Sequence, residues 1–275
     1  MKLGRIKLRV NACIGAALVG TVVLMAMLSI VWTPFDPLRM QSRLRLQPPS
    51  ARFLLGSDEF GRDVLSRIMA GAGTSLLVAA LTVLVALLIG VVIGLVAGYL
   101  RGWVDRVLMV ANDALLAFPG ILLALGVMVI VGANKWGIVL ALGLAYAPTA
   151  ARVVRGTVLS LREKEYIEAS RVIGNSGLRT VFVHILPNCV APLVVLATSM
   201  FGWVILAESA LSFLGLGVPP PAPTWGNMLS SARPYIESAA WLGIVPGACI
   251  AVTLLGVNLL GDALRDRLDP RMGLH

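Results

Sequence analysis

Residues Thr74 to Tyr99 read TSLLVAALTVLVALLIGVVIGLVAGY, a stretch of 26 residues without a charged side chain. A helix of this length is about 39 Å long at a rise of ~1.5 Å per residue, which exceeds the ~30 Å hydrocarbon core of a bilayer. A helix also satisfies its backbone hydrogen bonds internally, as a lipid environment requires. The stretch therefore predicts a transmembrane helix.

The rest of the chain has the same character. Of its 275 residues, 58% are hydrophobic and 13% are charged, and the mean hydropathy is +0.88, whereas about 25% of the residues of a soluble domain are charged. This composition excludes soluble enzymes, disordered linkers and collagen-like fibres. The apolar runs are 13–33, 74–99, 107–131, 136–151, 190–217 and 239–261. The predicted fold class is all-α, a polytopic membrane protein with six transmembrane helices.

Two of these runs differ from an ordinary span. The run 136–151 is shorter than the ~20 residues that cross a bilayer, but it can continue through Val154 if Arg152 and Arg155 reach the interface. The run 13–33 follows a basic segment, as a signal peptide does, yet no small-residue cleavage site closes it. We therefore expect it to be an uncleaved anchor.

Lysine and arginine are distributed unevenly between the connecting segments. If the N-terminus is cytosolic, the cytosolic segments hold 15 of the 23 basic residues; these segments are 1–12, 100–106, 152–189 and 262–275. Because basic residues concentrate in cytosolic loops, both termini are predicted to be cytosolic. The net charge of +9 then reflects the membrane topology. The expected surroundings of the chain are membrane lipid, and the charge does not indicate a nucleic-acid partner.

The external loop 34–73 contains a pattern typical of a helix. Ser57 can cap a helix whose first turn carries Asp58 and Glu59. Apolar residues then recur at helical spacing, namely Phe60, Val64, Leu65, Ile68 and Met69. This pattern predicts a short amphipathic helix on the outer membrane surface.

Two acidic residues and a neighbouring asparagine stand out inside the apolar runs. Asp113 and Glu208 are their only formal charges, and Asn112 adjoins Asp113. Each acid would cost at least about 2.5–3.5 kcal/mol if it faced lipid near the bilayer centre. They therefore either line a translocation pathway or make polar contacts between packed helices. Pro119, just beyond, is expected to bend the third span.

The longest cytosolic segment, 152–189, is also the most polar. Its centre predicts a helix with Tyr166, Ile167, Ala169, Ser170 and Ile173 on one face and charged residues on the other. Gly174 ends that helix, and a second amphipathic piece runs from Leu178 to Ile185. Such a helix, turn and helix is either a docking element for a cytosolic partner or an interfacial helix among the headgroups.

Sequence motifs for metal binding and nucleotide chemistry are absent. Cys13, Cys189 and Cys249 have no CxxC spacing, and His184 and His275 lie far apart, so no metal or redox site is expected. The sequence contains no GxxxxGK[ST], HExxH or GxSxG pattern. We therefore expect neither ATP binding nor hydrolysis by this chain.

The segment 165–187 resembles the EAA loop of importer-type ABC permeases. The pattern consists of Glu168-Ala169-Ser170, then Gly174, then Leu186-Pro187. Two positions differ, because Ser170 replaces the second alanine and His184 occupies an isoleucine position. The resemblance implies that the loop couples the permease to its ATPases, through Glu165, Glu168, Ala169, Ser170, Gly174, His184, Leu186 and Pro187.

Four further stretches resemble the C-type subunit of dipeptide, oligopeptide and nickel ABC importers. They are Leu55–Arg67, Leu116–Pro119, Glu208–Gly217 and Gly261–Pro270. The resemblance implies the permease fold of a type I ABC importer in a bacterial inner membrane. It also implies a heterodimer with a B-type permease subunit, two cytosolic ATPases that hold ATP and Mg, and an extracytoplasmic binding protein. No cofactor is expected on this chain.

The expected domain organisation follows the predicted topology. Residues 1–73 comprise a cytosolic tail, the first span and the external loop. Residues 74–262 form a five-helix permease core with the coupling loop 152–189, and residues 263–275 form a cytosolic tail. In this scheme Asn112, Asp113 and Glu208 belong to the pathway for a peptide or a nickel chelate.

Two other classes of membrane protein compete with this interpretation. A secondary transporter would show inverted repeats with matched broken helices, and the two halves of the sequence show no convincing repeat. An intramembrane hydrolase would need paired aspartates or a Ser/His set, which the apolar runs lack. The leading hypothesis is a non-enzymatic permease subunit of an ATP-driven importer.

Overall fold

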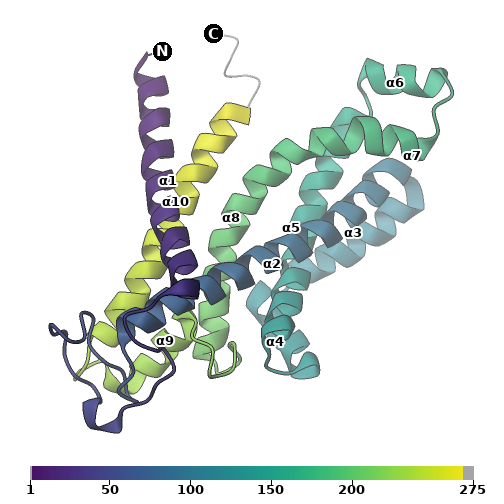
Figure 1. Cartoon of the computed structure of the whole chain (residues 1–275). Coiled ribbons are helices and arrows are strands. Elements are labelled where there is room, and N and C mark those ends of the chain that lie inside the picture. The colour runs from purple at the N-terminus through teal and green to yellow at the C-terminus, as the bar shows by residue number, and fades with distance from the viewer. Residues whose placement is uncertain (1, 269–275) are drawn as a thin grey trace.

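The computed structural model describes residues 2–268, which fold into helices joined by loops (Figure 1). The helices are α1 (Lys2–Val31), α2 (Val64–Leu100), α3 (Gly102–Leu116), α4 (Gly120–Val131), α5 (Lys135–Leu161), α6 (Glu165–Val172), α7 (Gly177–Thr180), α8 (Leu186–Phe213), α9 (Trp225–Ala232) and α10 (Trp241–Leu268). A π-helical turn, Val181–Ile185, joins α7 to α8. Residues 269–275 of the predicted cytosolic tail lie outside the described residues.

Five of the described helical segments are long and apolar enough to cross a membrane. The pair α3 and α4 forms a sixth crossing if it is counted as one span, and its two parts are bent by 95°. The break lies at 117–119 because Pro119 lacks an N–H and disfavours helical geometry in Phe118 before it. The all-helical, polytopic fold is therefore confirmed, and so is the bend expected in the third span.

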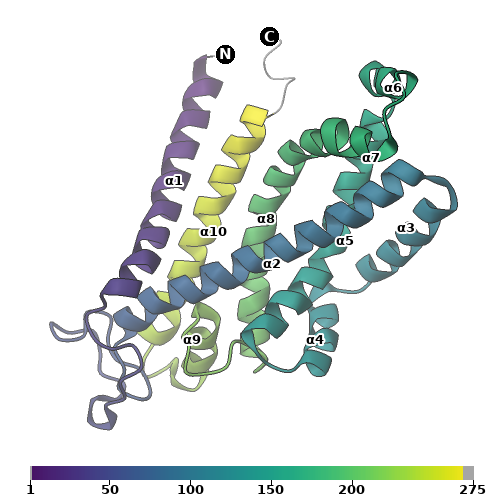
Figure 2. The ribbon, with the colours of Figure 1, turned by 45° about the vertical axis from the view of Figure 1, so that its right-hand side comes forward.

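The helix ends divide between two sides of the molecule. The start of α1, the end of α10 and the helix α6 lie at one end, while the loop before α2 and the helix α9 lie at the opposite end (Figures 1 and 2). This arrangement agrees with the topology predicted from basic residues, in which 1–12, 152–189 and the C-terminal tail share the cytosolic side.

The most extensive helix contact joins α2 to α5, and glycine makes it possible. A Cβ atom added at Gly90 would lie 2.8 Å from the Ala147 carbonyl oxygen, and one added at Gly94 would lie 2.6 Å from the Ala151 carbonyl oxygen. The two backbones can approach this closely only where α2 has no side chain. The helix α5 itself continues to Leu161, ten residues beyond the apolar run 136–151.

The prediction of an amphipathic helix that starts at Ser57 is wrong. The hydroxyl of Ser57 donates to the Leu44 carbonyl oxygen at 2.5 Å, and the Asp58 carboxylate accepts from the Arg62 amide at 2.9 Å, which closes a turn. The helix begins at Val64 instead, where Asp63 accepts from the Ser66 amide at 2.8 Å as the N-cap. It then continues without interruption as the second span. Between Ser57 and Asp63 the side-chain hydrogen bonds stabilise a turn, although the apolar residues recur at helical spacing.

The short helix α9 was not predicted, since eight residues are too few for a clear periodic signal. Its first residue, Trp225, is fully buried and binds α2 twice. Its amide donates to the Ser75 hydroxyl at 3.1 Å and its indole N–H donates to the Ile68 carbonyl oxygen at 3.2 Å. These bonds fix α9 against the outer end of α2.

Candidate functional site

The predicted helix, turn and helix of segment 152–189 are present. The helix α6 ends at Val172, and Gly174 follows with a φ of 88°, a left-handed conformation that glycine adopts without strain. The chain then turns back through α7, which Ser176 caps by accepting from the Arg179 amide at 3.3 Å. Figure 2 shows α6 standing beyond the ends of α5 and α2, with α7 leading into α8.

A small apolar cluster holds α6 in place. Ile167 is completely buried and packs with Val154 and Val158 of α5, with Ile185 at the end of the π-helical turn and with Cys189 of α8. Tyr99, near the end of α2, is packed against the same cluster. The cluster therefore seats α6 against three membrane helices, α2, α5 and α8, through close-packed side chains that do not deform freely.

The apolar face predicted for α6 was too wide. Ile167 and Ser170 are buried, whereas Tyr166, Ala169 and Ile173 are exposed. A helix of eight residues rests on its neighbours along a narrow stripe, so only positions three apart point inward. The outward side presents a mixed surface, which we call the α6 surface; its members are Glu165, Tyr166, Glu168, Ala169, Val172 and Ile173.

The two departures from the EAA pattern have structural roles. Ser170 is buried, its hydroxyl lies 3.3 Å from the Thr180 hydroxyl, and it accepts from the Asn175 side-chain amide at 3.1 Å. Serine thus ties α6 to α7 where alanine could only pack. The ring of His184 meets the ring of Tyr166 edge-on, with centroids 6.4 Å apart. Histidine therefore supports the α6 surface from the π-helical turn.

The remaining residues of the pattern lie around this element. Glu165, Glu168 and Gly174 are exposed, Leu186 is partly buried, and Pro187 is exposed at the start of α8. Proline is tolerated there because the first turn of a helix has no intrahelical acceptor for its missing N–H. The structure thus brings the eight coupling residues of the sequence analysis into one cytosolic element of α6, α7 and the start of α8.

Gly174→Val is expected to uncouple the transporter partially. A Cβ at Gly174 would meet no atom within 4 Å, so the cost is backbone strain of about 1–2 kcal/mol at positive φ, without a steric clash. We expect ATP hydrolysis stimulated by the loaded binding protein to fall severalfold in the reconstituted complex. Gly174→Asn, which tolerates this conformation, should stay near the wild-type rate. Equal losses in both variants would contradict the strain argument.

Ion pairs join α3 to α5 near the same end of the molecule. The Arg155 guanidinium donates to the Asp105 carboxylate twice, at 2.5 Å and 2.8 Å. One to two turns further on, Arg152 donates to Asp113 at 2.6 Å. Both side chains of the Arg152–Asp113 pair are 59% exposed. Asp113 is therefore paired with a neighbouring helix, and its assignment to the translocation pathway stays a prediction.

Charge reversal tests the Asp105–Arg155 pair. Asp105→Arg would place two guanidinium groups together in a site where the native side chains are only 17% and 31% exposed. We expect a lower melting temperature for the detergent-purified chain, corresponding to a loss of about 1–3 kcal/mol. The double variant Asp105→Arg with Arg155→Asp should recover at least half of that loss. No recovery would mean that the pair contributes little to the α3–α5 contact.

Asn112 and Glu208 occupy buried positions in different parts of the molecule. Asn112 donates to the Pro148 carbonyl oxygen at 3.2 Å, which joins α3 to α5 at the proline inside that helix. Glu208 is 2% exposed and accepts from Ser212 at 2.9 Å and from Thr224, the N-cap of α9, at 3.0 Å. Thus Asp113 and Glu208 belong to separate polar clusters, and the pathway role of each residue stays a prediction.

The comparisons with known proteins agree on one family. A family model described as a binding-protein-dependent transport system inner membrane component matches residues 90–274. The chain is 44% identical over 262 residues to a putative peptide transport system permease protein of Brucella abortus biovar 1 (strain 9-941), covering 95% of this chain and 88% of the relative. It is also 44% identical over 268 residues to the dipeptide transport system permease protein DppC of Escherichia coli (strain K12), covering 95% and 89%.

Two further comparisons point the same way. The di/tripeptide transport system permease protein DppC of Pseudomonas aeruginosa (strain UCBPP-PA14) is 42% identical over 245 residues, covering 87% of this chain and 81% of the relative. A crystal structure of an amino acid ABC transporter with histidines matches 70% of this chain and 90% of that chain, with a TM-score of 0.53 and 16% identity. The structural match shows the fold. The chain belongs to the family of inner membrane components of binding-protein-dependent transport systems.

Proposed function

We propose that this chain is one of two permease subunits of an ATP-driven peptide importer and that its α6 surface receives the motion of a cytosolic ATPase. Family membership makes it a multi-pass inner membrane protein and the non-catalytic subunit, without a cofactor of its own. An ATPase and a binding protein are general partners of such components. A B-type permease subunit as the second half and a pair of ATPases are our proposal.

The observation that supports the coupling role is the way α6 packs against the membrane helices. Its buried residue Ile167 is packed among α5 and α8, while its acidic side faces outward. An interfacial helix would bring Glu165 and Glu168 toward the anionic cytoplasmic leaflet, which repels them. A protein with a basic, partly apolar groove is a better match for this surface, which supports docking over the headgroup alternative.

The proposed division of the chain follows its contacts. Residues 74–262 supply the permease core and contain the coupling loop 152–189. Residues 1–73 add α1, which packs chiefly along α10, the external loop, and the start of α2 from Val64. We propose that these parts frame the core and that the end of α10, from Ala263 to Leu268, adjoins the ATPase side.

The substrate proposal comes from the relatives. Those named above are described as peptide, dipeptide and di/tripeptide transport permeases, and they cover most of this chain. A short peptide is therefore the proposed cargo, ahead of a nickel chelate.

Uptake in a deletion strain tests this function. Cells lacking this chain should lose the saturable uptake of labelled di- and tripeptides, retain nickel uptake, and recover peptide uptake with the wild-type chain. The tagged chain should also co-purify with an ATPase and a second permease subunit. Unchanged peptide uptake, or a chain purified without any ATPase, would overturn the proposal.

A further inference from the structure

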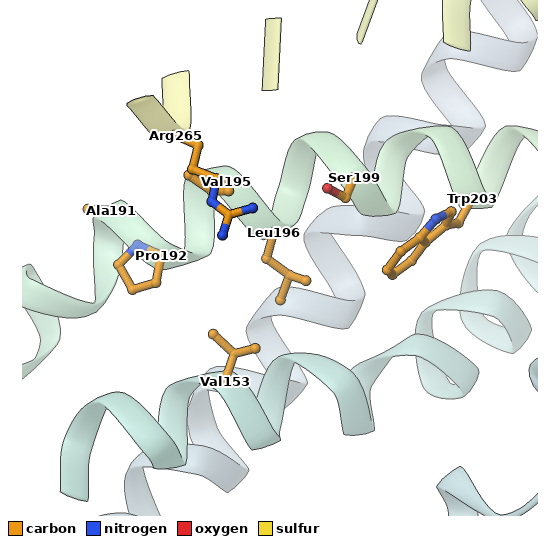
Figure 3. A pocket seen from close by; sticks show the side chains of 8 residues that line it. All are labelled: Val153, Ala191, Pro192, Val195, Leu196, Ser199, Trp203 and Arg265. Carbon is orange, nitrogen blue, oxygen red and sulfur yellow. The ribbon is translucent and has the colours of Figure 1, made fainter. Parts of the chain in front are cut away.

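A groove of about 470 Å³ runs along α8 from Ala191 to Trp203, on the side that faces α5 and the end of α10. It is lined by Val153, Ala191, Pro192, Val195, Leu196, Ser199, Trp203 and Arg265 (Figure 3). Apart from Trp203 near the middle of α8, the lining residues come from the predicted cytosolic halves of the three helices, so most of the groove lies in the inner part of the molecule. Its volume lies within the range of ~300–1,000 Å³ common for small-ligand sites.

The groove has one charged side chain and no compensating acid. Figure 3 shows the Arg265 side chain of α10 directed into the space between α8 and α5. None of the eight lining residues is acidic. Within residues 2–268, Arg265 has no carboxylate partner. Its guanidinium is thus available for an anion in a largely apolar wall.

We propose that this groove is an exit site for the transported peptide, in which Arg265 binds the C-terminal carboxylate. The proposal rests on the peptide-import function given above. A guanidinium can bind a carboxylate with two parallel hydrogen bonds, and the apolar wall accepts different side chains without selecting among them. Because Arg265 is exposed, the binding is weak. Weak binding suits a site that must release its occupant to the cytosol.

Ser199 favours a peptide over a lipid as the occupant. Its hydroxyl faces the groove farther along α8, and within the described chain it makes no hydrogen bond to another side chain. A lipid whose phosphate bound Arg265 would cover this hydroxyl with acyl chains, at the cost of an unpaired polar group. A peptide carries backbone amide and carbonyl groups that can bind it. The two occupants therefore make different predictions.

Thiol labelling in nanodiscs tests the site directly. The complete transporter is prepared with Ser199→Cys in a chain whose three native cysteines are replaced by alanine, in zwitterionic lipid without binding protein. Millimolar tripeptide should slow the maleimide labelling of position 199 at least about threefold, whereas the C-terminally amidated tripeptide should not. Adding Arg265→Gln should abolish this protection. Adding Arg267→Gln, an exposed control two residues on, should leave it intact.

The remaining outcomes overturn the inference. Protection by anionic phosphatidylglycerol but not by peptide would make the groove a lipid site. Equal protection by free and amidated tripeptide, or an unreactive thiol in the assembled complex, would exclude carboxylate binding at this groove. Peptide uptake by the wild-type transporter separates this failure from that of the proposed function. If uptake is present and protection is absent, only the exit site is wrong.

Discussion

Gly90→Val is expected to leave almost no folded chain in the membrane. A Cβ atom at this position would lie 2.8 Å from both the Ala147 carbonyl oxygen and the Ala151 nitrogen, so one of the two backbones must move. Overpacking typically costs about 1–3 kcal/mol and more where the backbone shifts. At about 3 kcal/mol the ratio of folded to unfolded chain falls more than a hundredfold. The amount of detergent-stable, monodisperse chain after solubilisation measures the effect.

Gly20→Val is the matched control, because Gly20 also lies in a predicted span and its added Cβ would meet no atom within 4 Å. The control should be recovered at close to the wild-type level. If Gly90→Val were recovered equally well, the close contact of α2 with α5 would not be what stabilises this fold.

Ile167→Asp is expected to abolish ATP-driven uptake while the spans still insert. The side chain of Ile167 is fully buried in the apolar cluster beneath α6. An unpaired carboxylate there costs about 3–5 kcal/mol. The chain can avoid this cost only if α6 detaches from the apolar cluster. Uptake should fall at least tenfold, and ATP hydrolysis should no longer respond to the loaded binding protein.

The conservative variant Ile167→Val is the control, because it keeps an apolar side chain in the cluster beneath α6. It removes one methylene group at a cost of about 0.5–1.5 kcal/mol, so it should keep most of the uptake. Full uptake by Ile167→Asp at normal expression would show that α6 does not transmit motion through this cluster.

The sequence predicted the membrane-crossing segments well because each of them is a long run of apolar residues with almost no charge. Each apolar run corresponds to a helix or, for 107–131, to the broken pair α3 and α4. The helix starts were harder to predict where side chains compete with the backbone, as at Ser57 and Asp58, whose hydrogen bonds close a turn before Asp63. Local chemistry decided that boundary, and periodicity alone could not.

The candidate site was predictable in outline and not in its contacts. The Glu168 to Pro187 spacing predicted a helix, a turn at Gly174 and a second helix, all of which are present. The burial of Ile167 could not be separated from that of Tyr166, because the sequence pattern assigns both to one predicted apolar face, whereas only Ile167 is buried. The pairing of Asp113 with Arg152 was not predicted, because the two residues are 39 positions apart in the chain and lie on different helices.

The stretch 74–99 also carries a sequence signal for helix packing. Gly90, Gly94 and Gly98 recur every four residues along the stretch 74–99 and face α5. Small residues at this spacing are typical of closely packed membrane helices. The signal identifies the packed face of α2 but not its partner, which requires the structure.

Photo-crosslinking from the α6 surface tests the central claim most directly. A benzophenone amino acid in place of Glu168, an exposed residue of α6, should form an adduct with the ATPase subunit in cells. The same group in place of Leu54, which is 63% exposed in the external loop, should form none with it. The account is contradicted if position 168 yields only lipid adducts, or if position 54 captures the ATPase.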